Sequence, residues 1–550
     1  MIEGKINGLK ASQVQALERI YRRKMPANAL VTAELARYLT ELSNDMQRQL
    51  GLIIDRSGTI QYVIVGDDRE IVIPDLSRYS LGRSGLRGLR CIHTHLRQEP
   101  LSRDDLTDLE LLRLDTMAVI GVRDDGLPGY LEYAHLLPTT AKTQLETVRL
   151  QDFYQLELDF SSFIHALEQE LERTAAETVD LSDGRERALL VSVGQGSRQT
   201  VEDSMAELDE LARTANLVVL DKVIQRPRQL NPRFLVGEGK LKEIIISALQ
   251  QRATLLVFDQ DLTPNQVRSI SAMTEMKVID RSQLILDIFA RRAQSRDGKV
   301  QVELAQLKYI LPRLTGKGTA MSRLMGGIGG RGPGETKLEI DRRRTRDKIR
   351  RLEKQLDALG RGRLQRRQKR IRAGVPIVSI VGYTNAGKST LLNALTQSAV
   401  LTEDLLFATL DTATRRLRFP LDREVIITDT VGFIRDLPPS LIGAFKATLE
   451  ELEDADLLLH LVDVSNPRFE EQISSVDKIL EDLKLGTHQR LLVFNKADKV
   501  SAADLPFLCR RYGALPISAL DRKTFAPLLV EMQQRFWPDE ILSEPFDGHP

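Results

Sequence analysis

A short glycine-rich stretch carries one lysine and one serine, the residue types that bind a phosphate chain and a metal ion. It reads GYTNAGKST from Gly382 to Thr390, between the apolar run Ile377 to Val381 and the helical stretch LLNALTQ. In this order of strand, glycine loop and helix, backbone N–H groups point at phosphate oxygens. Lys388 adds a cation for the β- and γ-phosphates, and Ser389 offers its hydroxyl oxygen to Mg²⁺. The spacing predicts a nucleoside triphosphate site.

Three further motifs follow in the order that P-loop GTPases use. DTVG, residues 429–432, comes after the apolar strand 425–427, so Asp429 would hold the Mg²⁺ shell and Gly432 would donate its N–H to the γ-phosphate. NKAD, residues 495–498, follows another apolar strand. Its last carboxylate can accept the N1–H and the exocyclic amine of guanine, which adenine lacks, while the asparagine braces the loop. SAL, residues 518–520, matches the loop whose backbone N–H reaches the guanine O6.

Hydrolysis of GTP requires a group that orients the attacking water, and the side chain at the usual position does not supply it in this sequence. Phe433 stands where Ras-like proteins have a glutamine that orients the attacking water, and an apolar side chain cannot do this. Asn385 either ligates K⁺ beside the β- and γ-phosphates or only hydrogen-bonds the switch. In the segment FATLDTATRR we predict Thr409 as the Mg²⁺ ligand that is released with the γ-phosphate, with Thr412 and Thr414 as alternatives.

These motifs define three sets of predicted site residues for GTP or GDP with Mg²⁺, and with K⁺ as the second candidate cofactor. The nucleotide-binding residues are Gly382, Tyr383, Thr384, Asn385, Ala386, Gly387, Lys388, Ser389, Thr390, Asp429, Thr430, Val431, Gly432, Asn495, Lys496, Asp498, Ser518, Ala519 and Leu520. The metal ligands are Ser389, Thr409 and Asp429, and the catalytic residues are Lys388, Thr409, Gly432 and Asn385.

Length and composition indicate a multidomain globular protein. A chain of 550 residues is too long for one hydrophobic core, and 42% apolar with 28% charged residues is an ordinary globular composition. No apolar run reaches the length of a spanning helix, and the first residues lack the apolar core of a signal peptide. Cys91 and Cys509 cannot form a disulfide framework. We therefore expect no membrane segment, a cytoplasmic location and a monomer.

The order of apolar and helical patterns predicts an α/β protein of several domains. A P-loop GTPase domain with a mostly parallel doubly wound sheet is preceded by an α/β domain with a helical hairpin arm and by a further amino-terminal α/β domain. In the last of these, strands are predicted at 61–65 and 71–74, and a helix at 153–174. The string VGEGK, residues 236–240, is a tight turn before a helix or a second nucleotide site. The predicted boundaries are 1–185 for the amino-terminal extension, 188–292 for the α/β domain, 293–374 for the arm with its glycine-rich loop, 375–540 for the G domain and 541–550 for a polar tail.

A basic stretch in the arm indicates a nucleic-acid partner. From Arg342 to Arg372 there are 15 Lys or Arg residues and 3 Asp or Glu residues. Next to a glycine-rich loop, such a helix suits an RNA backbone, which is bound largely through phosphate contacts, although a solvated helix face is the alternative. The predicted RNA-binding residues are Arg323, Arg331, Arg342, Arg343, Arg344, Arg366, Arg367 and Arg370.

Several long motifs together resemble the HflX family, a branch of the Obg-like GTPases. They are DTVGF, FATLD, FLVGEGKLKEI, VIDRSQLILDIFARRAQSRDGKVQVELAQLKYILPRL and GGIGGRGPGETKLEIDRRRTRDKI, and the resemblance covers roughly residues 188–540. It implies an HflX-type α/β domain at 188–292 and binding to the large ribosomal subunit and its rRNA. It also implies separation of stalled or idle 70S ribosomes and GTP hydrolysis stimulated by the ribosome. A GTP-switched rRNA-binding assembly or dormancy factor without splitting activity is the alternative.

The amino-terminal extension contains a second group of residues with chemical potential. CIHTHLRQEPLSRDDL places His93 and His95 at a strand end, followed by Ser102 and Asp105. The order of these residues resembles the zinc site of JAMM-type isopeptidases, but the spacing to the aspartate is one residue short and Gln47 stands where a general-base glutamate is expected. Ordinary surface histidines are the alternative.

Overall fold

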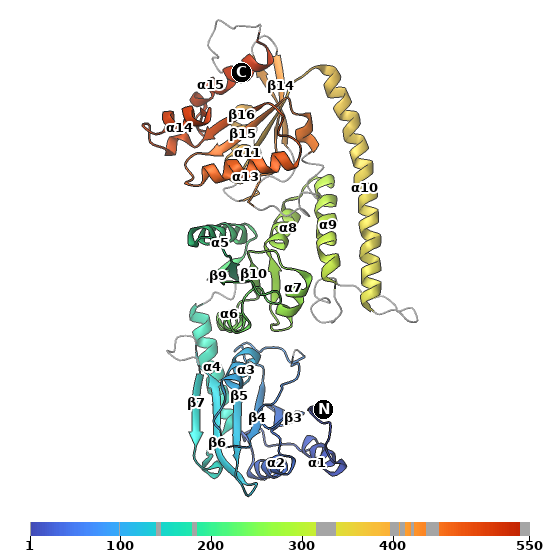
Figure 1. Cartoon of the computed structure of the whole chain (residues 1–550), viewed down its shortest axis with the longest axis vertical. Helices are drawn as coiled ribbons and strands as arrows, with labels where there is room; N and C mark the ends of the chain where they lie inside the picture. Colours follow the sequence, from blue (N-terminus) through green and yellow to red (C-terminus); the bar gives the residue numbers. More distant parts are fainter. Residues whose placement is uncertain are drawn as a thin grey trace. The chain divides into compact units, whose positions relative to one another are not determined.

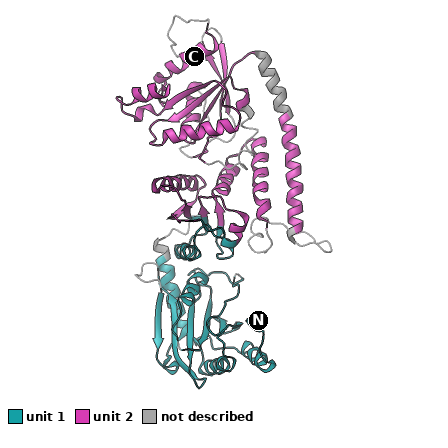
Figure 2. Cartoon of the chain, in the orientation of Figure 1, with its two compact units in different colours: residues 1–189, 230–256, 269–277 teal, residues 190–229, 257–268, 278–550 magenta. Residues whose placement is uncertain are grey.

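The computed structural model describes residues 2–76, 78–97, 99–138, 145–178, 184–314, 337–396, 406–407, 413–419, 423–435 and 450–538, with side chains throughout except at 175–178, 337–338, 361–373 and 450–451. The chain forms two compact units, which are described separately (Figure 2). The first comprises residues 1–189, 230–256 and 269–277, and the second comprises 190–229, 257–268 and 278–550. Among the described residues, no helix is long and apolar enough to cross a membrane.

A seven-stranded sheet in the order β1-β3-β2-β4-β5-β6-β7 is the centre of the first unit (Figure 1). The pairs β1–β3 and β4–β5 are parallel, and the other neighbours are antiparallel. Every residue of β4 and β5 is buried, including the polar residues Arg90, His93 and His95 of β4. The strands are β1 Ile2–Gly4, β2 Leu50–Asp55, β3 Ile60–Val65, β4 Leu89–His95, β5 Thr116–Val122, β6 Pro128–Leu136 and β7 Leu145–Leu150.

Two of the predicted elements in this unit need correction. The strand predicted at 71–74 does not form, since residues 71–76 have no regular secondary structure. The helix predicted from 153 begins later, because the Asp159 carboxylate accepts a hydrogen bond from the Ser162 N–H at 2.8 Å and caps the new helix. The helices are α1 Ala11–Tyr21, α2 Ala33–Met46, α3 Arg103–Leu112, the 3-10 turn η1 Phe153–Gln155 and α4 Phe160–Thr178.

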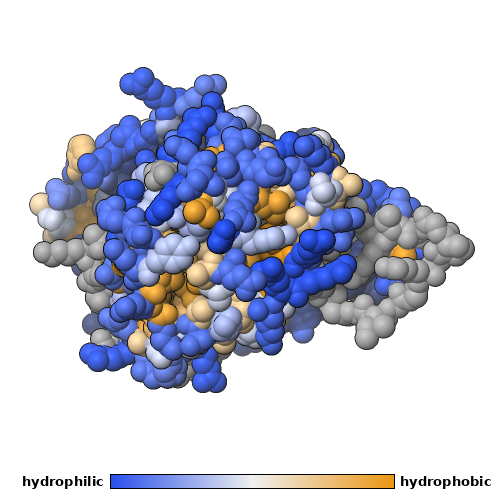
Figure 3. All heavy atoms as spheres, turned by 90° about the horizontal axis from the view of Figure 1, so that it is seen from below, coloured by the Kyte–Doolittle hydropathy of each residue, from blue (hydrophilic) through white to orange (hydrophobic). Residues whose placement is uncertain are grey.

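One face of the molecule, seen from below relative to the view of Figure 1, is mainly hydrophilic (Figure 3). Hydrophobic atoms appear there in patches between polar ones. Large apolar side chains of this unit that are exposed include Ile6, Tyr21, Val72 and Tyr154, which are distant in sequence. Scattered exposed apolar residues are normal on a globular surface and need no partner.

A four-stranded sheet in the order β11-β10-β8-β9 follows, with helices between its strands. In the segment VGEGK, Gly237 is the N-cap of α6, and its last three residues begin that helix. The elements are β8 Arg187–Val193, α5 Arg198–Thr214, β9 Val218–Gln225, α6 Glu238–Gln250, β10 Leu255–Phe258, α7 Pro264–Ser271, β11 Lys277–Asp280 and α8 Arg281–Arg292.

Two long helices then run side by side, α9 Arg296–Ile310 and α10 Lys337–Ala373, with the 3-10 turn η3 Leu311–Arg313 after the first (Figure 1). Leu304 and Leu307 of α9 pack against Ile349 and Leu352 of α10. Lys308 Nζ lies 2.8 Å from Glu353 Oε1 across the pair. Burial of apolar residues on one stripe of each helix stabilises the hairpin, and most of the basic side chains of α10 that the structure describes are exposed.

The last domain has a six-stranded sheet in the order β13-β14-β12-β15-β16-β17. All neighbouring pairs are parallel except β13–β14, which agrees with the predicted doubly wound fold. The strands are β12 Ile377–Gly382, β13 Ala413–Phe419, β14 Arg423–Asp429, β15 Leu457–Asp463, β16 Arg490–Asn495 and β17 Leu515–Pro516. The helices are α11 Lys388–Thr396, α13 Phe469–Asp482, α14 Leu505–Tyr512 and α15 Ala526–Phe536, with 3-10 turns η4 Glu450–Asp454, η5 Ala497–Lys499 and η6 Arg522–Phe525.

A fully buried histidine in the middle of β15 makes this domain sensitive to acid. Burial, with the nearby charges of Arg490 and Lys388, lowers the pKa of His460 to about 3. In the unfolded chain this histidine takes up a proton near pH 6.5, whereas in the folded domain it stays neutral. The free energy of unfolding therefore falls as the pH drops below 6.5. We expect His460→Leu to remove roughly 2 kcal/mol of the stability loss between pH 7 and pH 5. Hydrogen exchange of β15 and β16, compared between variant and parent at each pH, measures this difference; an equal acid sensitivity would contradict it.

Candidate functional site

The loop between β12 and α11 has the backbone shape that surrounds a phosphate group. Gly387 has a φ of +92°, and a Cβ there would lie 2.3 Å from Asn495 Nδ2. A Cβ on Gly432 would lie 2.9 Å from Thr384 Cα and 3.0 Å from Lys388 Nζ. Asn385 also has a positive φ, 60°, which asparagine tolerates better than most residues. Only glycine fits at 387 and 432, so the DTVG loop lies directly against the phosphate loop.

Lys388 is held inside this loop as its cation. Its Nζ donates to Tyr383 O at 2.8 Å and to Gly382 O at 3.2 Å, and the residue is buried. Burial lowers the pKa of Lys388 to about 8, although the Asp429 carboxylate acts in the opposite direction. A buried ammonium that donates its hydrogen bonds to neutral carbonyl oxygens favours an anionic ligand, because phosphate oxygens supply further negative charge.

Two of the predicted metal ligands lie in contact. Ser389 Oγ donates a hydrogen bond of 2.6 Å to Asp429 Oδ2, and Asp429 is fully buried at the end of β14. A hydroxyl and a carboxylate oxygen are the hard ligands that Mg²⁺ prefers, and two protein ligands leave room for phosphate oxygens and water. The third predicted ligand, Thr409, lies outside the described residues, as does Thr412. Thr414 lies within β13, where it pairs with Thr428 of β14.

Asn495 connects the phosphate loop with the predicted guanine loop. Its Nδ2 donates to Ala386 O at 2.8 Å, and its Oδ1 accepts from the Ala519 N–H at 2.8 Å. Only 1% of the surface of this side chain is exposed. The two loops that contact the phosphates and the base are thus tied by one amide.

The other predicted base-binding residues differ in exposure. Asp498 is exposed in the turn η5, so its carboxylate is accessible to a base. Lys496 has a φ of +59° and its Nζ lies 2.7 Å from Asp463 Oδ2. Ser518 and Ala519 are buried, whereas Leu520 is 83% exposed and only its backbone is suited to the predicted site.

Phe433 closes the DTVG loop through its backbone. The Thr384 N–H donates to Phe433 O at 2.7 Å, and the Phe433 N–H donates to Gly382 O at 3.0 Å. The phenyl ring is 2% exposed. Its side chain packs inside the domain, so it cannot orient a water molecule at the phosphates.

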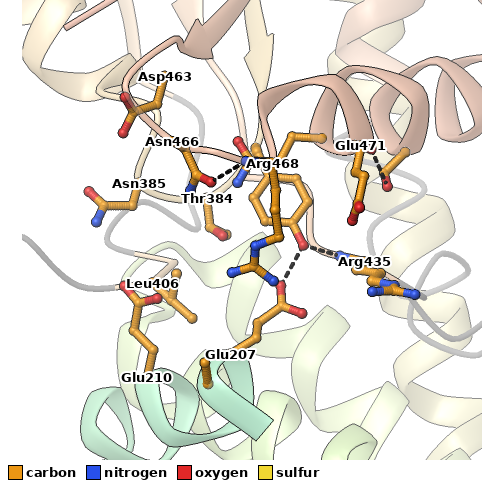
Figure 4. Close-up of a pocket in the computed structure, with 14 residues that line it drawn as sticks. Glu207, Glu210, Thr384, Asn385, Leu406, Arg435, Asp463, Asn466, Arg468 and Glu471 are labelled. Atoms are coloured by element: carbon orange, nitrogen blue, oxygen red, sulfur yellow. Dashed lines mark hydrogen bonds between the residues drawn. The ribbon is translucent and has the colours of Figure 1, made fainter. Parts of the chain in front are cut away.

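A pocket lies beside the phosphate loop (Figure 4). Thr384 and Asn385 of the loop line it together with Asp463, the last residue of β15, and Asn466, which follows that strand. Glu207 of α5 contributes a carboxylate from the opposite side. Asn385 and its neighbours therefore line one polar space beside the phosphate loop.

Sequence patterns missed a buried charged network that ends in this pocket. The Tyr383 hydroxyl donates to Glu207 Oε1, and it accepts the Arg435 N–H at 2.7 Å. Glu207 Oε2 lies 2.7 Å from Arg281 Nη2, whose other nitrogen lies 3.0 Å from Asp259 Oδ1. The Tyr383 side chain turns to Glu207, and its contact with the nucleotide stays a prediction. One sequence signal could have indicated this network. Its charged residues stand at positions that the apolar periodicity of the chain assigns to the buried faces of helices and strands.

The predicted RNA-binding residues are described in part. Arg343 and Arg344 of α10 are exposed and Arg342 is half-buried. Arg366, Arg367 and Arg370 belong to the same helix, although their side chains are outside the description. Arg323 and Arg331 lie outside the described residues. The described part of α10 therefore presents a basic surface.

Comparison with known proteins matches three consecutive segments to family models. Residues 202–290 match the GTP-binding GTPase N-terminal family, 292–370 the GTP-binding GTPase middle region, and 377–496 the 50S ribosome-binding GTPase family. The GTPase HflX of Caldanaerobacter subterraneus subsp. tengcongensis is 50% identical over 319 residues, 58% of this chain and 74% of the relative. The GTPase HflX of Escherichia coli (strain K12) is 44% identical over 319 residues, 58% of this chain and 75% of the relative.

Solved structures with a detectable likeness include a GTP-binding protein from the archaeon Sulfolobus solfataricus in complex with GDP. It is 26% identical, covers 64% of this chain and 98% of its own, and has a TM-score of 0.36. A crystal structure of SsGBP with GDP has the same identity and coverage and a TM-score of 0.37. The family of this chain is shown by its sequence relatives and not by these structures.

Proposed function

The chain belongs to the HflX family of GTPases, and on that premise we propose that it binds the large ribosomal subunit and, with GTP bound, separates stalled or idle 70S ribosomes. It is a GTP hydrolase. We place its action in the cytoplasm, as a monomer, with the G domain at 375–540, the α/β domain and arm at 188–374 and the extension at 1–185. The observation that carries the proposal is the basic helix α10, which is joined to a G domain. The phosphate loop of that domain holds the buried Lys388 and the contact between Ser389 and Asp429.

In the proposed reaction the protein binds and orients the triphosphate. The buried ammonium of Lys388 holds the β- and γ-phosphates, and the Gly432 N–H donates to the γ-phosphate. When bound, Mg²⁺ at Ser389 and Asp429 supplies positive charge to the phosphate oxygens. Because Phe433 cannot position water, we propose that intrinsic hydrolysis is slow and that the ribosome supplies the missing group.

A monovalent cation at Asn385 is the second part of this proposal. The residue follows Thr384 in the phosphate loop and faces the polar pocket of Figure 4. An amide oxygen there would ligate K⁺ next to the bond that breaks, where added positive charge stabilises the transition state. We expect turnover to fall roughly tenfold when K⁺ is replaced by Na⁺, an effect absent in Asn385→Ser. Steady-state hydrolysis with and without ribosomes measures it, and equal rates in both salts would refute the cation site.

Ribosome separation is tested with 70S particles, the full chain and a non-hydrolysable GTP analogue. If binding of the GTP-bound form drives separation, sucrose-gradient profiles will show free subunits without hydrolysis, and GDP will not produce them. If the protein binds the large subunit with GTP but leaves 70S particles intact, it is a GTP-switched assembly or dormancy factor and the splitting proposal is wrong.

The basic surface of α10 predicts how binding depends on salt. The variant replaces Arg342, Arg343 and Arg344 together by Gln. We expect the slope of log affinity for the large subunit against log salt concentration to become smaller by about one for each phosphate contact that is lost. Affinity for the large subunit should fall several-fold at low salt. The matched control is Arg19, Arg22 and Arg23 replaced by Gln, which removes the same charge at the end of α1. Pelleting assays at several KCl concentrations measure both, and a slope that is unchanged in the α10 variant would exclude these arginines.

A further inference from the structure

Three side chains of the first unit converge in a way that the proposed GTPase function does not use. His93 and His95 alternate on β4 and so face the same side of the sheet, while Asp105 lies in the first turn of α3. His93 Nε2 is 3.0 Å from His95 Nε2 and 3.4 Å from Asp105 Oδ1, and His95 Nε2 is 3.6 Å from Asp105 Oδ2. Both histidines are buried. The alternative of ordinary surface histidines is therefore excluded.

These separations match the edges of a metal coordination sphere. Zinc bonds to imidazole nitrogen and carboxylate oxygen are about 2.0–2.2 Å long, so two ligand atoms at the tetrahedral angle lie roughly 3.3 Å apart. The three measured separations, 3.0, 3.4 and 3.6 Å, surround this value. Two imidazoles and one carboxylate also form a ligand set that zinc uses.

Neighbouring groups orient the ligands. His95 Nδ1 lies 2.8 Å from Glu99 O, and because a carbonyl only accepts, this nitrogen must carry the proton. Nε2 of His95 then presents its lone pair to the centre of the cluster, as a metal ligand must. The Ser102 hydroxyl donates to Asp105 Oδ2 at 2.7 Å, and the Ser102 N–H donates to the same oxygen at 2.8 Å. The cluster is thus preorganised around a point between its three members.

We propose that the first unit binds one Zn²⁺ ion through His93 Nε2, His95 Nε2 and the Asp105 carboxylate, with a fourth position for water or an exogenous ligand. The proposal is independent of the GTPase function, because all its ligands lie in the extension. Gln47 stands at the position where the sequence predicts a general-base glutamate. Gln47 is exposed and its amide donates to Asn44, whereas the buried Gln49 lies two residues before Gly51, which pairs with His93. An amide cannot take up a proton, so neither glutamine can act as the base that hydrolysis needs.

The test uses the full-length chain without a histidine tag, stripped with a chelator, incubated with Zn²⁺ and separated by gel filtration. Elemental analysis should find about one zinc ion per chain. Asp105→Asn should lower zinc affinity at least tenfold while it keeps the helix cap, since its amide oxygen can still accept from Ser102. His95→Gln should act in the same direction. Co²⁺ in place of Zn²⁺ should give the visible absorption of a tetrahedral site in the parent only.

The matched control is His135→Gln. His135 Nε2 lies 3.4 Å from Glu146 Oε2, the same separation as in the His93–Asp105 pair, but among the described residues it belongs to no group of three possible metal ligands. Its zinc content should equal that of the parent. Zinc below about a tenth of one ion per chain in the parent, a preference for iron over zinc in competition, or full zinc content in Asp105→Asn would each overturn the proposal. GTP binding, measured in parallel, should be unchanged in every variant, so failure of the zinc site and failure of the proposed function are distinguishable.

Discussion

Asp498→Asn is expected to convert the protein from guanine to xanthine nucleotides. The exposed carboxylate in η5 is predicted to accept two hydrogen bonds from guanine, and the amide can accept only one and repels the exocyclic amine. Hydrogen bonds to a charged group contribute roughly 1.5–3 kcal/mol each, so GTP affinity should fall roughly 10²- to 10⁴-fold. Xanthine has an oxygen in place of that amine, which the new amide N–H can reach. Isothermal titration with GDP and XDP measures both changes.

The control for this prediction is Asp504→Asn, the same substitution on another exposed aspartate six residues further along the chain. It should bind GDP as tightly as the parent and should not bind XDP. If Asp498→Asn retained the parent's GDP affinity, the carboxylate would not contact the base, and the motif would specify only the shape of the loop that Asn495 holds.

Arg281→Met is expected to destabilise the contact between α5, α8 and the phosphate loop by roughly 3–5 kcal/mol. Burial acts to lower the pKa of Arg281, but Glu207 and Asp259 outweigh this and raise it above its usual value, so the guanidinium is charged. Its side chain is 7% exposed, and those of Glu207 and Asp259 are 10% and 2% exposed. Removing the cation leaves two buried carboxylates facing each other, which costs more than the ion pair itself contributes.

Hydrogen exchange of α5 and α8 measures this locally, which is necessary because a multidomain chain does not unfold in one step. The triple variant Arg281→Met with Glu207→Gln and Asp259→Asn should recover most of the loss, since no buried charge remains. Equal protection in Arg281→Met and the parent would show that the network contributes nothing to stability. Because the Tyr383 hydroxyl donates to Glu207, nucleotide affinity should also change in the single variant and less in the triple variant.

The sequence by itself determined the G domain and its phosphate loop, because each motif there is short, contiguous and dictated by local backbone shape. Gly387 has a positive φ, and Asn495 reaches both loops from the end of a strand, so residue type and spacing suffice to predict them. The doubly wound sheet followed from alternating apolar strands and helices for the same reason. The strand predicted at 71–74 failed because a short apolar run has no periodicity of its own.

Only the tertiary structure decided which charged residues meet. Tyr383 and Glu207 are separated by 176 positions, and no local pattern distinguishes the buried Glu207 from the other acidic residues of α5. The order of His93, His95 and Asp105 raised the question of a metal, but their distances depend on where α3 begins and how it packs beside β4. Helix and strand periodicity specify faces, whereas a site made from several elements requires the packing of those faces against one another.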